Sequence, residues 1–131
     1  MSDELRTPEE LSEYGRSLRE KVPLESHAGW SPGAGRADPV ILIEQQNKDR
    51  LDWLVPVRRA RMKVSPFTFY RGGARIMAAD LAHTPVSGLT TQICGDAHLA
   101  NFGSFASPER RLVFDLYDFD ETLPGPWEWD V

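Results

Sequence analysis

Apolar residues are sparse at the start of the chain and recur with helical rather than alternating spacing. The segment TPEE, beginning at Thr7, is typical of a helix start, because the Thr can cap the first turn, the Pro fits it and Glu10 completes a capping box. We predict a helix from there to about Lys21, ended by Pro23. Its few apolar positions predict a helix on the surface: Leu11, Tyr14, Leu18 and Val22.

A Gly- and Pro-rich stretch, 24–37, follows this helix and predicts an irregular linker. Asp38-Pro39 then predicts the cap and first turn of a second helix. We expect its buried side to comprise Val40, Ile41, Ile43, Leu51 and Leu54. The chain is therefore divided into 1–37, a helix with its linker, and 38–131, the main domain.

The rest of the chain changes from helical to strand-like patterning. Ser65-Pro66 predicts a third helix start, which the Gly pair at 72–73 weakens as it continues. Two short β-prone runs follow, 90–94 and 111–117, with a turn-like segment at 107–110. We predict an α+β protein, mostly helical, with a short β-hairpin near the carboxyl end.

Composition excludes several classes of protein. The 131 residues carry a net charge of -5, whereas a general nucleic-acid binder is normally basic. A single Cys cannot form an internal disulfide. The first twenty residues contain no apolar segment typical of a secretory signal, and the longest aliphatic run, 40–43, is too short to span a bilayer. We expect a cytoplasmic protein without membrane or nucleic-acid partners.

The segment ICGDAHLANFG, from Ile93, contains the main candidate residues. Asp96 and Asn101 lie five positions apart after the first β-prone run, and Asp118 ends the second run. Phosphoryl transfer uses a carboxylate near the attacking hydroxyl, and magnesium prefers carboxylate and amide oxygens. Four acids crowd positions 115–121, and a cation would relieve their repulsion. Asp120 is a possible second metal ligand.

Simpler interpretations of these residues stay open. Asp96 and Asn101 can cap a turn, the acids near Asp118 can form a solvated strand edge, and His98 can be a structural hydrogen-bonding group. A basic patch is either a solvated helix face or a phosphate-facing surface, with Arg71 the best candidate for phosphate contact. The patch comprises Arg58, Arg59, Arg61, Lys63, Arg71 and Arg75.

The stretch GDAHLANFG resembles the catalytic loop of aminoglycoside and choline kinase-like phosphotransferases, although Cys94 stands where their pattern has a His. The resemblance implies a magnesium- or manganese-dependent transfer of phosphate from ATP to an unknown small-molecule or protein acceptor. It also implies roles for single residues: Asp96 as catalytic base, His98 as its orienting neighbour, Asn101 and Asp118 as magnesium ligands, and Asp130 as a brace for the loop.

A closer resemblance covers roughly residues 57–131. The blocks SPFTFYRGGARIMAADLA and CGDAHLANFGSFASPERRLVFDLYDFDETLPGPWEWDV resemble the beginning of a bacterial family, domain of unknown function 2252. A kinase-like site also needs a Gly-rich loop and a strand Lys, and neither Lys21, Lys48 nor Lys63 has that setting. We therefore expect an incomplete kinase-like domain, inactive alone, whose partner is the missing C-terminal half of its own domain.

Two alternatives compete with this reading. The chain can be a truncated or regulatory module that binds a metal or a partner without catalysis. The stretch VFDLYDFDETL also resembles the first motif of haloacid dehalogenase-type phosphatases, in which Asp118 would be the nucleophile and Asp120 its acid or base.

Overall fold

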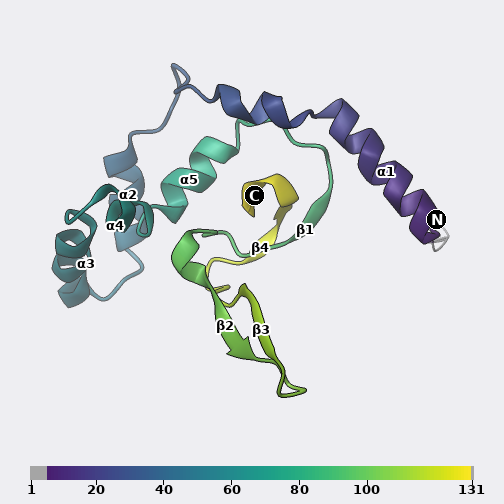
Figure 1. The fold of residues 1–131 in the computed structure, drawn as a ribbon. Coiled ribbons are helices and arrows are strands. Elements are labelled where there is room, and N and C mark those ends of the chain that lie inside the picture. The colour runs from purple at the N-terminus through teal and green to yellow at the C-terminus, as the bar shows by residue number, and fades with distance from the viewer. Residues whose placement is uncertain (1–5, 131) are drawn as a thin grey trace.

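The protein is described by a computed structural model that covers residues 6–130. Its class is mixed α/β, with helices in the first two thirds and two small antiparallel sheets after them (Figure 1). The helices are α1 (Pro8–Lys21), α2 (Pro39–Asn47), α3 (Val55–Met62), α4 (Pro66–Tyr70) and α5 (Ala74–Leu81). The strands are β1 (Thr90–Ile93), β2 (Phe102–Ala106), β3 (Leu112–Leu116) and β4 (Leu123–Pro126). Short 3-10 helices are η1 (Leu24–Gly29), η2 (Asp52–Leu54), η3 (Leu99–Asn101) and η4 (Trp127–Asp130).

Helix α1 forms as its sequence predicts. The Thr7 hydroxyl accepts a hydrogen bond from the Glu10 N–H at 3.2 Å, and the Glu10 carboxylate accepts one from the Thr7 N–H at 2.7 Å. The helix ends at Lys21 and has no buried residue, so its prediction as a surface helix is confirmed. None of the helices described between residues 6 and 130 is long and apolar enough to cross a membrane.

Helix α2 begins as predicted but buries a different set of residues. The Asp38 carboxylate caps it through the Val40 N–H at 2.7 Å. The predicted buried side is wrong: Val40, Ile41, Leu51 and Leu54 are exposed, and Ile43 is half-buried. The run 40–43 is continuously apolar and winds around the helix instead of lining one face, and α2 ends at Asn47, so Leu51 and Leu54 lie beyond it.

Polar contacts join α2 to the next helices. The Arg58 guanidinium on α3 donates to Asn47 Oδ1 at 3.1 Å and to Gln46 Oε1 at 2.8 Å. It also donates to the Gly72 carbonyl between α4 and α5. The Gly pair at 72–73 separates these two helices, as its weak helix propensity predicts. One Arg side chain therefore connects three segments of the helical part.

The two strand pairs differ from the predicted hairpin. Strand β1 pairs with β4, with Thr91 opposite Gly125, while β2 and β3 form the hairpin around the turn at 107–111. The predicted turn at 107–110 and the run 111–117 thus belong to a hairpin, but its first strand is β2, while the run 90–94 pairs with β4. The true partners were missed because FGSFA and LPGP are rich in residues that strands disfavour.

The core of the described residues is small and partly polar. Its buried hydrophobic residues are Met62, Ala74, Ile93 and Cys94, and its buried polar residues are Asn47, Ser87, His98, Asn101 and Glu128. The Ile93 side chain fills the space beside Gly125, where an added Cβ would lie 2.8 Å from its Cδ1. The β1–β4 pair thus carries the best-packed part of the fold, and the candidate loop starts directly from it.

Candidate functional site

The chain turns sharply where β1 meets the candidate loop. Gly95 has φ of +79°, a conformation that residues with a Cβ rarely adopt. A Cβ at this position would also collide with the backbone carbonyl of Glu121. Gly95 therefore lets the loop after β1 lie directly against the segment that precedes β4.

Asp130, in η4, holds the start of the same loop. Its Oδ2 accepts a hydrogen bond from the Cys94 N–H at 2.6 Å, and its Oδ1 accepts one from the Gly95 N–H at 3.2 Å. Hydrogen bonds from backbone amides to a carboxylate are among the stronger ones in proteins. Asp130 thus lies behind the loop and contacts its backbone.

Asn101 closes the loop from the inside. Its side chain is buried, and its Nδ2 donates to the Asp96 carbonyl at 2.7 Å, which also accepts from the His98 N–H at 2.7 Å. At the end of β3, the Tyr117 N–H donates to the Asn101 carbonyl at 3.1 Å. The Asn101 amide therefore ties the loop together, and the residue does not line the cavity described below.

His98 is buried behind Asp96 against helix α4. Its Nε2 lies 3.5 Å from Asp96 Oδ2, and its ring centroid lies 6.4 Å from that of Phe67 and 6.2 Å from that of Tyr70. Within residues 6–130 its Nδ1 has no hydrogen-bond partner. The imidazole thus lies beside the Asp96 carboxylate, on the side that faces the protein interior.

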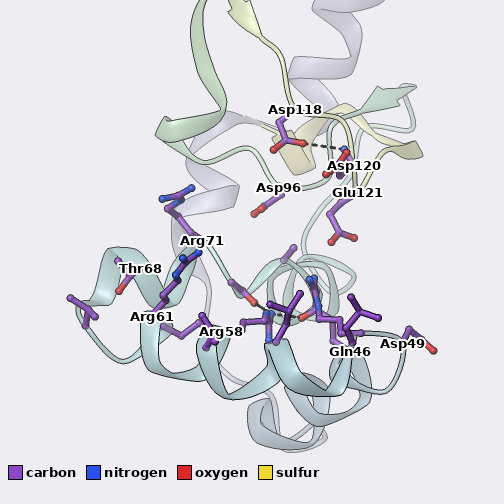
Figure 2. Close-up of a pocket in the computed structure, with 18 of the residues that line it drawn as sticks. Gln46, Asp49, Arg58, Arg61, Thr68, Arg71, Asp96, Asp118, Asp120 and Glu121 are labelled. Atoms are coloured by element: carbon purple, nitrogen blue, oxygen red, sulfur yellow. Dashed lines mark hydrogen bonds between the residues drawn. The ribbon is translucent and has the colours of Figure 1, made fainter.

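A cavity of about 790 Å³ lies in front of Asp96. Figure 2 shows Asp96, Asp118, Asp120 and Glu121 from the loops on one side of it, and guanidinium groups of the helical part on the other, where Asp49 also lies. We name the first group the acidic wall: Asp96, Asp118, Asp120 and Glu121. We name the second the basic wall: Arg50, Arg58, Arg61 and Arg71. Among the residues that the structure describes, no ion pair joins the two walls.

The charges of the two walls act on Asp96. Burial is the main cause that raises the pKa of its carboxyl above the ordinary value, and the charges of Glu121 and Asp118 add to it. His98 and Arg71 act in the opposite direction. Asp96 therefore shares its electrostatic environment with Asp118 and Arg71, which the sequence places about twenty positions away on either side.

Asp118 and Asp120 follow β3 in a tight turn. Asp118 Oδ1 accepts a hydrogen bond from the Asp120 N–H at 3.2 Å, and both residues line the cavity (Figure 2). The structure thus gathers Asp96, Asp118, Asp120 and Arg71 at one cavity, whereas His98, Asn101 and Asp130 lie outside its lining.

Parts of this cavity were not predicted from the sequence. Arg50 was not recognised, and Glu121 was considered only as one of four crowded acids that either form a strand edge or attract a cation. Arg58 was assigned to a basic patch, but its contacts with α2 were not foreseen. Burial and the neighbouring Arg50 lower the pKa of Arg58, while Glu121 raises it. Charge alone could have marked these residues, but only the fold shows which of them face the cavity.

The described side chains of the cavity do not form a closed protein cage for a metal ion. Among residues 6–130, no three His, Cys, Asp or Glu side chains are placed to hold a metal ion. Magnesium, however, commonly uses one or two carboxylates together with waters and substrate phosphates. Asp118 and Asp120 line the same cavity beside several guanidinium groups, and they are carboxylates of the number that such a site uses.

We expect the substitution Asp96→Asn to stabilise the protein at pH 7. Because the pKa of Asp96 is raised in the folded state, ionisation opposes folding, and this loss of stability develops as pH rises from the ordinary pKa through the raised one. Urea unfolding should therefore show a gain at pH 7 that disappears below about pH 4. Asp115→Asn, at an exposed β3 position, is the control. A loss of stability at pH 7 that is specific to Asp96→Asn would contradict the raised pKa of Asp96 in the folded protein.

Comparison with known proteins places most of this chain in one family. Residues 50–131 match the family described as "Uncharacterized protein conserved in bacteria (DUF2252)". No curated protein and no solved structure shows a significant match. The matched segment includes every residue of both walls and the whole loop, and it covers more than half of the chain. The chain therefore belongs to the bacterial family DUF2252.

Proposed function

We propose that the cavity binds a phosphate-bearing nucleotide together with a divalent metal ion. The chain would then be the metal- and base-carrying half of a kinase-like phosphotransferase. The observation that carries this proposal is the pair of oppositely charged walls, which face one cavity without pairing with each other. A magnesium–phosphate complex offers negative oxygens to the arginines and a cation to the carboxylates, so it satisfies both walls at once.

The basic wall would hold the phosphates. Arg58 is already fixed by its bonds to α2 and Gly72, so Arg50, Arg61 and Arg71 are the guanidinium groups of the wall left for a ligand. A guanidinium group binds a phosphate through two parallel hydrogen bonds, which fixes its orientation as well as its position. Arg71 lies directly after α4, on the same side of the cavity as Arg61 (Figure 2).

The acidic wall would carry the chemistry. Asp96 would accept the proton of the attacking hydroxyl, and its raised pKa makes it a better base than an exposed carboxylate. Asp118 and Asp120 would hold the metal ion, which when bound would neutralise charge on the phosphate oxygens. His98 would keep the Asp96 side chain in place, and Asp130 would hold the loop. Asn101 is assigned as a metal ligand by the resemblance alone.

We expect binding without turnover. A kinase-like site also uses a Gly-rich loop and a Lys to hold the nucleotide, and no Lys lines the cavity in the described part of the chain. The Gly-rich loop and the nucleotide-binding Lys would come from the other half of the domain, and the acceptor would be a separate small molecule or protein.

Calorimetric titration tests this proposal directly. We expect ATP and inorganic triphosphate to bind in the presence of magnesium, and adenosine not to bind, because the walls recognise the metal-bound phosphates. Chelating the metal with EDTA should weaken the binding of both. Equal binding of ATP with and without metal, or no binding of either phosphate compound, would contradict the proposal. A coupled assay should show no ATP hydrolysis by the chain alone.

A further inference from the structure

The hairpin of β2 and β3 has an open edge on each side. Among the residues that the structure describes, these two strands pair only with each other, and the hairpin projects from the rest of the chain (Figure 1). A two-stranded hairpin alone is marginally stable in water, and an open strand edge is a template for pairing with another strand. None of its strand residues lines the cavity of Figure 2, so an inference about the hairpin is independent of the proposed function.

One face of the hairpin is apolar and exposed. Side chains alternate between the two faces along a strand. The register therefore places Leu112, Phe114 and Leu116 of β3 on one face, together with Phe102 of β2. Leu112 is 80% exposed and Phe114 is 71% exposed. An exposed apolar patch of this kind is typical of a surface that binds a partner.

The open edge of β3 offers backbone groups for hydrogen bonding. Just outside the ends of β3, the Arg111 carbonyl accepts from the Ser107 N–H at 2.9 Å, and the Tyr117 N–H donates at 3.1 Å to the residue that precedes β2. Hydrogen-bonded pairs alternate along an antiparallel ladder, so the odd-numbered residues of β3 direct their backbone groups to β2. The N–H and C=O groups of Leu112 and Phe114 therefore point to the open edge.

Two opposite charges lie symmetrically about Val113. Arg111 precedes this residue by two positions and Asp115 follows it by two, so the three side chains share the other face of the strand. Arg111 and Asp115 are exposed, and neither takes part in an ion pair within residues 6–130. If two β3 strands run antiparallel and are centred on Val113, each Arg111 lies opposite the Asp115 of the other copy.

We propose that β3 binds the β3 strand of a second copy of this chain, antiparallel and centred on Val113. In this register the outward backbone groups of Leu112 meet those of Phe114 from the other copy, as an antiparallel ladder requires. The same two side chains become neighbours on the apolar face, and two Arg–Asp ion pairs form on the opposite face. The two hairpins join into one four-stranded sheet, which is a more stable unit than either hairpin alone.

The charge pattern selects this partner and this register. Because the two charges are symmetric about Val113, the strand that matches both of them is a second copy related by a two-fold axis. Centring the pair on Leu112 would instead place each Arg111 opposite the uncharged Val113. The segment FGSFA of β2 carries no charge, so its open edge lacks such a feature to fix a register.

Sedimentation velocity of the whole chain measures the association. One pair of strand edges is a small contact, so we expect a weak dimer with a dissociation constant of about 100 μM. The chain should be largely dimeric at about 1 mM and monomeric at about 1 μM. Urea unfolding at about 1 μM therefore follows the monomer, in which Asp115 contacts no second copy.

Charge reversal tests the register. Arg111→Asp and Asp115→Arg each bring like charges together twice in the dimer, so each should weaken it at least about tenfold. An equimolar mixture of the two variants should recover the wild-type affinity, because every pair in the mixed dimer is again of opposite charge. Glu13→Arg, at an exposed α1 position, changes the net charge as Asp115→Arg does and should leave the dimer unchanged.

Oxidative cross-linking tests the position of the axis. The two Val113 residues would form a non-hydrogen-bonded pair with Cα atoms about 4.5 Å apart, a separation that suits a disulfide. Val113→Cys should therefore form an intermolecular disulfide with oxidised glutathione. Ser104→Cys, at an exposed position on β2, is the matched control and should not. The native Cys94 is buried and should not react in the wild-type chain.

Each result supports or overturns the proposal. A wild-type chain that stays monomeric at about 1 mM overturns it and leaves the apolar face to a different partner. A mixture of folded Arg111→Asp and Asp115→Arg variants that stays as weak as either variant overturns it as well. Equal cross-linking through Ser104→Cys and Val113→Cys has the same consequence. Recovery in the mixture, together with a disulfide specific to Val113→Cys, supports the proposal.

Discussion

Replacement of Gly95 by Ala is expected to destabilise the protein by about 3 kcal/mol. Two separate effects contribute to this loss. Gly95 has a positive φ of +79°, which any residue with a Cβ adopts at a cost. The added Cβ would also meet the backbone carbonyl of Glu121, and a backbone atom cannot move aside as the end of a side chain can. Urea unfolding followed by circular dichroism measures the change in the free energy of unfolding.

Gly88→Ala is the matched control for this prediction. Gly88 also has a positive φ, of +94°, but an added Cβ there meets no atom within 4 Å. Its substitution should therefore cost about 1 kcal/mol, the contribution of backbone conformation alone. The difference between the two variants measures the contact between the candidate loop and Glu121. Equal losses would show that this contact is absent or easily relaxed.

The second large effect is expected from Asp118→Asn, which should weaken magnesium–ATP binding at least about tenfold. The substitution keeps the shape of the side chain and its ability to accept the Asp120 N–H, so the turn after β3 should persist. It removes one of the carboxylates that line the cavity, and its charge is among those that raise the pKa of Asp96. Calorimetry on folded variants measures the change in the dissociation constant.

Asp115→Asn is the control for the metal prediction, because Asp115 is exposed on β3 and does not line the cavity. Its affinity for magnesium–ATP should equal that of the wild type. If both substitutions weaken binding to the same extent, the effect reflects the net charge of the chain, and Asp118 is not a ligand. If neither changes it, the nucleotide binds elsewhere.

Local features of the fold were predictable because they depend on residues close in sequence. The capping boxes that begin α1 and α4, and the break between α4 and α5, follow from hydroxyl, Pro and Gly positions alone. Strand pairing was not predictable, because β4 is the segment LPGP, in which Pro and Gly hide any strand signal. Its partner β1 ends thirty residues earlier, and contacts that support the pairing, such as Ile93 on Gly125, exist only in the folded chain.

The candidate site was likewise predictable from the sequence only in part. The sequence predicted that Asp96, Asp118 and Arg71 serve one site, and they do line one cavity. It could not show that the Asn101 amide turns toward the Asp96 carbonyl, since an Asn between two glycines fits a ligand and a brace equally well. The burial of Glu128 was not predicted, because a single acid between two Trp residues forms no recognisable pattern.

The pairing of β1 with β4 holds the two ends of residues 94–122 together, so this segment forms one closed loop. The tip of the β2–β3 hairpin, at Ser107–Arg111, lies at the far end of this loop (Figure 1), and none of its residues lines the cavity of Figure 2. Lengthening a loop that is already closed costs little entropy. The tip is therefore a suitable place to insert an epitope or a fluorescent label, which would report on the protein without contacting the acidic wall or the basic wall.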